Sequence, residues 1–204
     1  MKEAVINGIF PTPIYMSKLD RKLTPLELKF VEKSKKNFHK NAGNITSNNN
    51  YILNEKPFFN LKKELDLKVK DYFEKVISPT DAITPYITQS WLNYTETNQY
   101  HHKHSHANSL VSGVFYINCH EELDKIKFFN DTYKTIKPEI KTWNMWNSES
   151  WWFNVKTGDI IMFPSSLKHM VENKEGTNTR ISLAFNVFIK GTIGINKELT
   201  ELII

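Results

Sequence analysis

The sequence predicts an α+β chain that is mainly β, with a helical N-terminal support packed against a β-sandwich or barrel. Two observations carry this prediction. Apolar residues recur at spacings of three and four in the first third of the chain, which is typical of helices. After about residue 82 the apolar runs become short and β-rich, and turn-forming residues separate them. The length of 204 residues suits a single domain over 1–204, with the support in 1–80 and the β-rich part in 81–204.

The first third begins with an extended segment and continues with two helices. Residues 5–16 look like a short extended pair interrupted by two prolines. Thr24-Pro25-Leu26-Glu27 is a capping box with proline at the first helical position, so we expect a helix to begin here. A second helix is predicted over 58–77, because apolar residues repeat on one face: Leu61, Leu65, Val69, Phe73 and Val76. The polar run 44–50 predicts a loop, and His39 falls in a lysine-rich stretch that we expect to be helical.

The rest of the chain predicts six strands. Each is a short run rich in β-branched and aromatic residues, and no helical run of ten residues lies between them. The expected strands cover residues 83–94, 109–118, 125–129, 151–155, 159–163 and 180–189. Many short strands without intervening helices favour a sandwich or a barrel over a parallel α/β sheet.

Composition excludes several classes of protein. No stretch approaches the roughly 18 consecutive apolar residues of a membrane span, and the N-terminus has no apolar signal-peptide region. The single cysteine, Cys119, excludes a disulfide scaffold and fits a reducing compartment. We therefore expect a cytoplasmic protein with no membrane partner.

The net charge of +5 says little about partners, because 25 of the 27 basic residues are lysine. Proteins that read bases or grip phosphates in a bidentate way rely on arginine. This chain has only Arg21 and Arg180, so these two side chains are worth close examination.

Four of the seven histidines fall within six positions: His101, His102, His104 and His106. On an extended segment, His104 and His106 project to the same side, which allows both imidazoles to reach one metal ion. Imidazole suits Fe, Zn, Cu or Ni at neutral pH. A solvated loop would explain the cluster equally simply. His169, after the predicted strand 159–163, is the natural third ligand, or alternatively a surface residue.

Alternation along the last predicted strand places Arg180, Ser182, Ala184 and Asn186 on one face. A guanidinium with a neighbouring hydroxyl can hold a carboxylate through a bidentate pair. An arginine on an exposed edge strand is the simpler alternative.

Two paired motifs resemble the signature of a family of 2-oxoglutarate/Fe(II) oxygenases common in phages and marine bacteria. The first is His104-Ser105-His106-Ala107-Asn108-Ser109, continuing to Ser112-Gly113-Val114-Phe115-Tyr116. The second is Phe163-Pro164-Ser165, followed by His169, Arg180-Ile181-Ser182 and Asn186. The opening Ile9-Phe10-Pro11-Thr12-Pro13-Ile14-Tyr15 is also similar, so the resemblance covers nearly the whole chain.

The resemblance implies a double-stranded β-helix, the jelly-roll or cupin-like barrel, with a metal near one mouth. By that analogy His104, His106 and His169 bind Fe(II). Arg180, Ser182 and Tyr116 would hold the distal carboxylate of the co-substrate 2-oxoglutarate, and Asn93 would touch it. The implied reaction uses O2 to convert 2-oxoglutarate into succinate and CO2 while a C–H bond of a second substrate is oxidised.

One departure keeps two other functions open. The wider superfamily uses two histidines and a carboxylate, whereas the middle position here is His106, with Asp131 as a reserve ligand. Three histidines with an open position are also a catalytic zinc pattern, so a cupin-like zinc hydrolase is the first alternative. A non-catalytic metal-binding barrel is the second.

The substrate of the implied oxygenase is predicted only by analogy. Prolyl or other protein side-chain hydroxylation is favoured, and nucleic acid or a small molecule is the alternative. Tryptophans gather just before the second motif, either as a recognition surface for a peptide or nucleobase or as packing of the outer sheet: Trp143, Trp146, Trp151 and Trp152.

Overall fold

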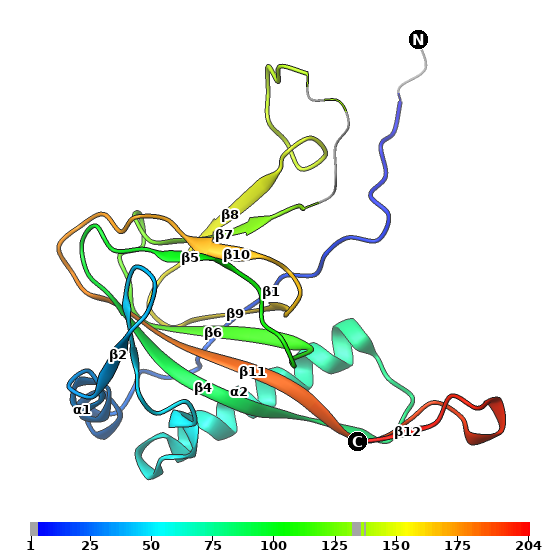
Figure 1. The fold of residues 1–204 in the computed structure, drawn as a ribbon, viewed down its shortest axis with the longest axis horizontal. Coiled ribbons are helices and arrows are strands. Elements are labelled where there is room, and N and C mark those ends of the chain that lie inside the picture. Colours follow the sequence, from blue (N-terminus) through cyan, green and yellow to red (C-terminus); the bar gives the residue numbers. More distant parts are fainter. Residues whose placement is uncertain (1–3, 132–135, 137) are drawn as a thin grey trace.

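Two antiparallel sheets face each other, and two helices cover the outside of the larger one (Figure 1). The computed structural model describes residues 4–131, 136 and 138–204. The larger sheet has the order β1-β9-β6-β11-β4-β3-β2, with β12 paired to the end of β11, and the smaller has the order β5-β10-β7-β8. The predicted class, mainly β with a helical support, is confirmed.

The elements have the following bounds. The helices are α1 (Pro25–Ser34) and α2 (Phe59–Tyr72), which continues as the π-helical turn η3 (Phe73–Ile77), with short 3-10 turns η1 (Ile52–Asn54), η2 (Lys56–Phe58) and η4 (Asn196–Glu198). The larger sheet contains β1 (Tyr15–Lys18), β2 (Phe38–Lys40), β3 (Ile45–Ser47), β4 (Ile83–Thr95), β6 (Val111–Asn118), β9 (Asp159–Pro164), β11 (Arg180–Ile193) and β12 (Leu202–Ile203). The smaller sheet contains β5 (His101–His104), β7 (Lys125–Phe129), β8 (Ser150–Asn154) and β10 (His169–Val171).

Both predicted helices form where the sequence places them. The capping box is complete, because the Glu27 backbone N–H donates to the Thr24 hydroxyl and the Thr24 N–H donates to the Glu27 carboxylate. Helix α2 buries Leu61, Leu65 and Val69 against the outer face of the larger sheet. This stripe holds the sheet from behind and leaves its other face free for the site.

The larger sheet has apolar packing on both faces. One core cluster joins the helices to residues such as Leu92, Leu183 and Phe185 of the larger sheet. A second cluster lies between the sheets and includes Tyr116, Ile126, Phe128, Ile161 and Phe163. Because one cluster combines helical and sheet residues, the N-terminal support packs directly on the β-rich part.

Three sequence-based expectations about the N-terminal region are wrong. Residues 5–13 form no strand, and only β1 pairs, since Pro11 and Pro13 cannot donate to a ladder. His39 lies in strand β2 rather than in a helix. The expected loop at 44–50 contains β3, whose Ser47 hydroxyl accepts the backbone N–H of Leu92 at 3.0 Å. Tertiary pairing with β4 thus overrides a polar local sequence.

No helix in the described ranges is long and apolar enough to cross a membrane.

Replacing Leu65 by alanine should destabilise the fold by about 2–5 kcal/mol, because a fully buried leucine leaves a cavity. Leu67→Ala is the matched control on the same helix: Leu67 is 63% exposed, and its loss should change the free energy of unfolding by less than about 0.5 kcal/mol. Urea denaturation followed by circular dichroism measures both. Equal effects would contradict the packing of α2 described above.

Candidate metal centre

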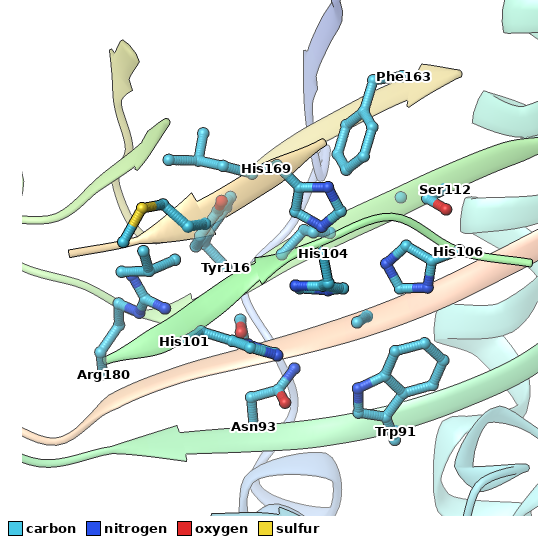
Figure 2. Close-up of a pocket in the computed structure, with 17 residues that line it drawn as sticks. Trp91, Asn93, His101, His104, His106, Ser112, Tyr116, Phe163, His169 and Arg180 are labelled. Carbon is cyan, nitrogen blue, oxygen red and sulfur yellow. The ribbon is translucent and has the colours of Figure 1, made fainter. Parts of the chain in front are cut away.

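The structure brings His104, His106 and His169 together at one end of the space between the sheets (Figure 2). His104 ends β5, His106 lies two residues beyond it, and His169 begins β10 directly opposite His104 in the strand register. The ring centroids of His104 and His169 are 4.3 Å apart, and those of His106 and His169 are 5.2 Å apart. One ring nitrogen from each residue lies within 4.8 Å of the other two, which is the spacing of a metal triad.

Backbone carbonyls select the tautomers of two of these rings. His104 Nδ1 is 2.7 Å from the carbonyl oxygen of His102, and His169 Nδ1 is 3.1 Å from that of Leu167. A carbonyl only accepts, so both Nδ1 atoms carry the proton and both Nε2 atoms keep a free lone pair. Burial lowers the pKa of His106 to about 4 and that of His169 to about 3. The rings are therefore uncharged at neutral pH, as metal ligands must be.

His106 reaches the triad by a route that strand alternation does not describe. Strand β5 ends at His104, and the next residues form a loop. The His106 backbone N–H donates to the Ser165 carbonyl at 2.9 Å, which ties this loop to the turn before His169. The expected convergence of the two side chains is thus seen, but the strand geometry expected to cause it is wrong.

A second group of three imidazoles, from His101, His102 and His104, also lies within 4.8 Å. It shares His104 with the first group. Because His104 Nδ1 donates to the His102 carbonyl, only Nε2 can bind a metal, and one ion at a time can use it. The two groups therefore cannot each bind a metal at the same time. Only the first group combines a histidine of β5 with one of β10.

Asp131 does not complete the site, so its assignment as a reserve ligand is wrong. Its carboxylate accepts from Lys103 at 2.8 Å and pairs with Lys168 at 2.6 Å. Among the described residues, neither triad includes it. Asp131 links the outer sides of the two segments that carry His104 and His169.

Arg180 lies at the other end of the same cavity and is 2% exposed (Figure 2). Its Nε and Nη1 atoms are buried and have no hydrogen-bond partner within the described ranges. None of the described residues that line the cavity is acidic. A buried guanidinium without a counter-charge is costly, so this end of the cavity fits an anion.

The other predicted co-substrate residues converge on Arg180. The register places Ser182 beside Asn93 on β4 and beside Tyr116 on β6, and all three line the cavity. The Asn93 Oδ1 atom is buried without a partner in the described part of the chain. The sequence patterns do not indicate Thr95, which lies opposite Arg180 in the register and has a buried hydroxyl without a described partner, although it does not line the cavity. Strand pairing, which single-strand alternation cannot supply, is the signal that finds it.

The chemistry of these donors fits Fe(II) and a dicarboxylate. Three uncharged imidazoles, each offering one ring nitrogen to the triad, suit a divalent transition metal. The guanidinium of Arg180, which has no described partner for Nε and Nη1, suits a carboxylate. Apolar side chains of Val114, Ile126 and Phe163 also line the cavity.

Replacing His169 by alanine should weaken metal binding by at least about 100-fold, because a three-ligand site loses one ligand. Asp131→Asn is the matched control and should leave the affinity within about threefold, since Asp131 contacts lysines instead of the triad. Titration with Co(II), followed by visible absorption, measures both. Comparable losses of Co(II) affinity in the two variants would indicate that Asp131 is a metal ligand.

The part of the chain that carries this cavity is similar to a known protein family. Residues 89–186 match a family model described as Putative 2OG-Fe(II) oxygenase. No curated protein matches the chain in sequence.

Several solved structures share the double-stranded β-helix fold at low sequence identity. One is a prolyl hydroxylase from Trichoplax adhaerens, in complex with a hypoxia inducible factor oxygen degradation domain peptide fragment. It is 11% identical to this chain, with a TM-score of 0.59, and the match covers 86% of this chain and 83% of that one. A Pseudomonas putida prolyl-4-hydroxylase is 11% identical, with a TM-score of 0.53 and coverage of 86% and 92%. HygX from Streptomyces hygroscopicus, with nickel, 2-oxoglutarate and hygromycin B bound, is 11% identical, with a TM-score of 0.54 and coverage of 86% and 82%.

At these identities the likeness is one of fold. The family match covers every side chain of the cavity described above, so residues 89–186 are similar to the 2OG-Fe(II) oxygenases, the family that the motifs resemble.

Proposed function

We propose that the chain is a 2-oxoglutarate- and Fe(II)-dependent dioxygenase that hydroxylates a second substrate. The observation that carries the proposal is Arg180, a buried guanidinium with unpartnered Nε and Nη1 atoms in a cavity that also holds three convergent histidines. A carboxylate would remove the cost of burying this charge. A zinc hydrolase or a simple metal-binding barrel would use the histidines and leave Arg180 without a role.

Each residue has a defined task in this proposal. His104, His106 and His169 would hold Fe(II), which when bound supplies the redox chemistry that turns 2-oxoglutarate and O2 into succinate and CO2 and hydroxylates a C–H bond. Arg180 would bind the distal carboxylate through its planar fork. Ser182, Tyr116 and Asn93 would complete the polar end, a role that their shared register around β11 supports.

Exclusion of water is the task of the cavity walls. Phe163 is fully buried and its ring packs against His169 with centroids 4.6 Å apart. Phe128 lies on the same side of His169, with its ring centroid 6.3 Å from that of His169 and 5.0 Å from that of Phe163. These rings fix the imidazole and keep bulk water from the proposed metal ligand, which strengthens every charge interaction in the cavity.

Arg180→Lys should weaken 2-oxoglutarate binding by at least about tenfold, because the charge remains while the bidentate pair is lost. Anaerobic titration of the Fe(II)-loaded protein, with the visible charge-transfer band as readout, measures this affinity. Arg21→Lys is the matched control, because Arg21 pairs with Glu27 and Glu64 far from the cavity. Unchanged 2-oxoglutarate affinity in Arg180→Lys would contradict the proposal.

For the second substrate we propose a protein side chain, with proline favoured. A groove next to the cavity is lined by exposed aromatic residues, including Trp146 and Trp151, which are 52% and 44% exposed. Phe128 lines this groove, and its ring centroid is 6.3 Å from that of His169, so the groove adjoins the cavity. Rigid aromatic surfaces of this kind suit extended, proline-containing peptides.

The likeness to a prolyl hydroxylase solved with a peptide fragment supports the same substrate class. The tryptophans expected either to recognise a ligand or to pack the outer sheet are all exposed, between 44% and 60%. Exposure of four large apolar side chains in one region favours recognition over packing.

Proline-containing peptides should stimulate succinate formation above the level without peptide. Trp151→Ala should raise the peptide KM by about tenfold, because a groove aromatic is lost. Trp152→Ala is the matched control: Trp152 neighbours Trp151 on β8 and is 52% exposed, but it does not line the groove. Equal effects in the two variants, or stimulation by nucleosides alone, would contradict a peptide substrate.

A further inference from the structure

His101 lines the cavity but has no task in the function proposed above. It is the first residue of β5, and its ring stacks on that of His104 with centroids 4.6 Å apart and planes inclined by 17°. Figure 2 shows it between Arg180 and His104, along the line that joins the two ends of the cavity. A dicarboxylate that reaches from Arg180 to the metal ligands must pass this ring.

A hydrogen bond from the N-terminal region fixes the tautomer of His101. Its Nε2 atom is 3.2 Å from Asn41 Nδ2. The Asn41 amide oxygen already accepts the Ala42 backbone N–H at 2.8 Å, which orients the amide so that Nδ2 donates. His101 Nε2 is therefore the acceptor, and the ring proton sits on Nδ1. Within the described ranges no group accepts a hydrogen bond from this Nδ1, so the donor is free for a ligand.

The loop that supplies Asn41 is built to dock on β5. Asn41 lies between β2 and β3, and its N–H donates to the Asn44 carbonyl. Gly43 adopts a φ of +92°, and a Cβ there would lie 2.6 Å from the Tyr100 carbonyl oxygen. The Tyr100 N–H in turn donates to the Gly43 carbonyl at 3.1 Å. Only glycine permits this close approach, which holds Asn41 against the residue that follows Tyr100.

We propose that His101 is a positioning residue for the dicarboxylate co-substrate, and that Asn41 acts through it by setting which ring nitrogen donates. The inference rests on the proposed function, since it takes 2-oxoglutarate as the ligand. A metal role for His101 is disfavoured because its triad shares the single free nitrogen of His104. A hydrogen-bond donor in a cavity without acidic described residues is suited to an anion instead.

The test compares 2-oxoglutarate affinity with metal affinity in the full chain loaded with Co(II). His101→Phe keeps a stacking ring but removes Nδ1, and should weaken 2-oxoglutarate binding by about tenfold while Co(II) affinity stays within about threefold. His101→Asn places an amide donor near the former Nδ1 and should recover part of the loss. Asn41→Ala should weaken binding by about threefold, through loss of ring orientation. His39→Phe, on β2 of the same hairpin and outside the cavity, is the control.

Calorimetry gives the 2-oxoglutarate affinity, and visible absorption gives the Co(II) affinity. Unchanged 2-oxoglutarate affinity in His101→Phe would overturn the inference while leaving the function intact. A parallel loss of Co(II) affinity would also overturn it and would make His101 part of the metal site. If the wild-type protein binds Co(II) but no 2-oxoglutarate, the proposed function itself fails. Circular dichroism confirms that each variant is folded.

Discussion

The antiparallel ladder of β11 between β4 and β6 is the constraint on which the site depends. Side chains alternate along β11, so Arg180 and Ser182 face the cavity while Leu183 and Phe185 face the helices. A slip of one residue would exchange these sets, placing a guanidinium in the apolar core. The leucine stripe of α2 therefore stabilises the register as well as the fold, because it accepts only the apolar face of the strand.

A buried network of hydroxyls links the two sequence motifs. Ser165 Oγ lies 2.7 Å from Ser109 Oγ and 2.8 Å from Ser112 Oγ, and Ser112 donates to Asn186 Oδ1. The Ser165 carbonyl accepts the His106 N–H. This network joins the loop after β5, the turn after β9 and the strand β11. The motif serines thus have a structural explanation: they hold the two histidine-bearing segments at a fixed separation, which a metal triad requires.

The long, strongly patterned elements could be predicted from the sequence, whereas short polar strands could not. The capping box before Pro25 and the alternation from Arg180 onward each carry a local physical signal. Strands β3, β5 and β10 are three or four residues long, and β5 reads His-His-Lys-His, which has no apolar alternation. Their pairing is decided by partners distant in sequence. For the same reason the histidines could be identified as candidates, while the contact of His101 with Asn41 depends on a hairpin that the sequence pattern did not reveal.

The distribution of charge separates the tasks of the cavity and the groove. The cavity holds a buried guanidinium, uncharged imidazoles and no acidic side chain among its described lining residues. A ligand that enters it must bring negative charge, or the guanidinium stays uncompensated. A neutral prolyl side chain cannot do this, so the cavity alone would not select a peptide. The aromatic groove beside it has the opposite character, because exposed rings favour apolar contact and discriminate weakly on charge. Phe128 lines the groove and its ring neighbours that of His169, so recognition in the groove is adjacent to His169 without requiring the substrate to compete for Arg180.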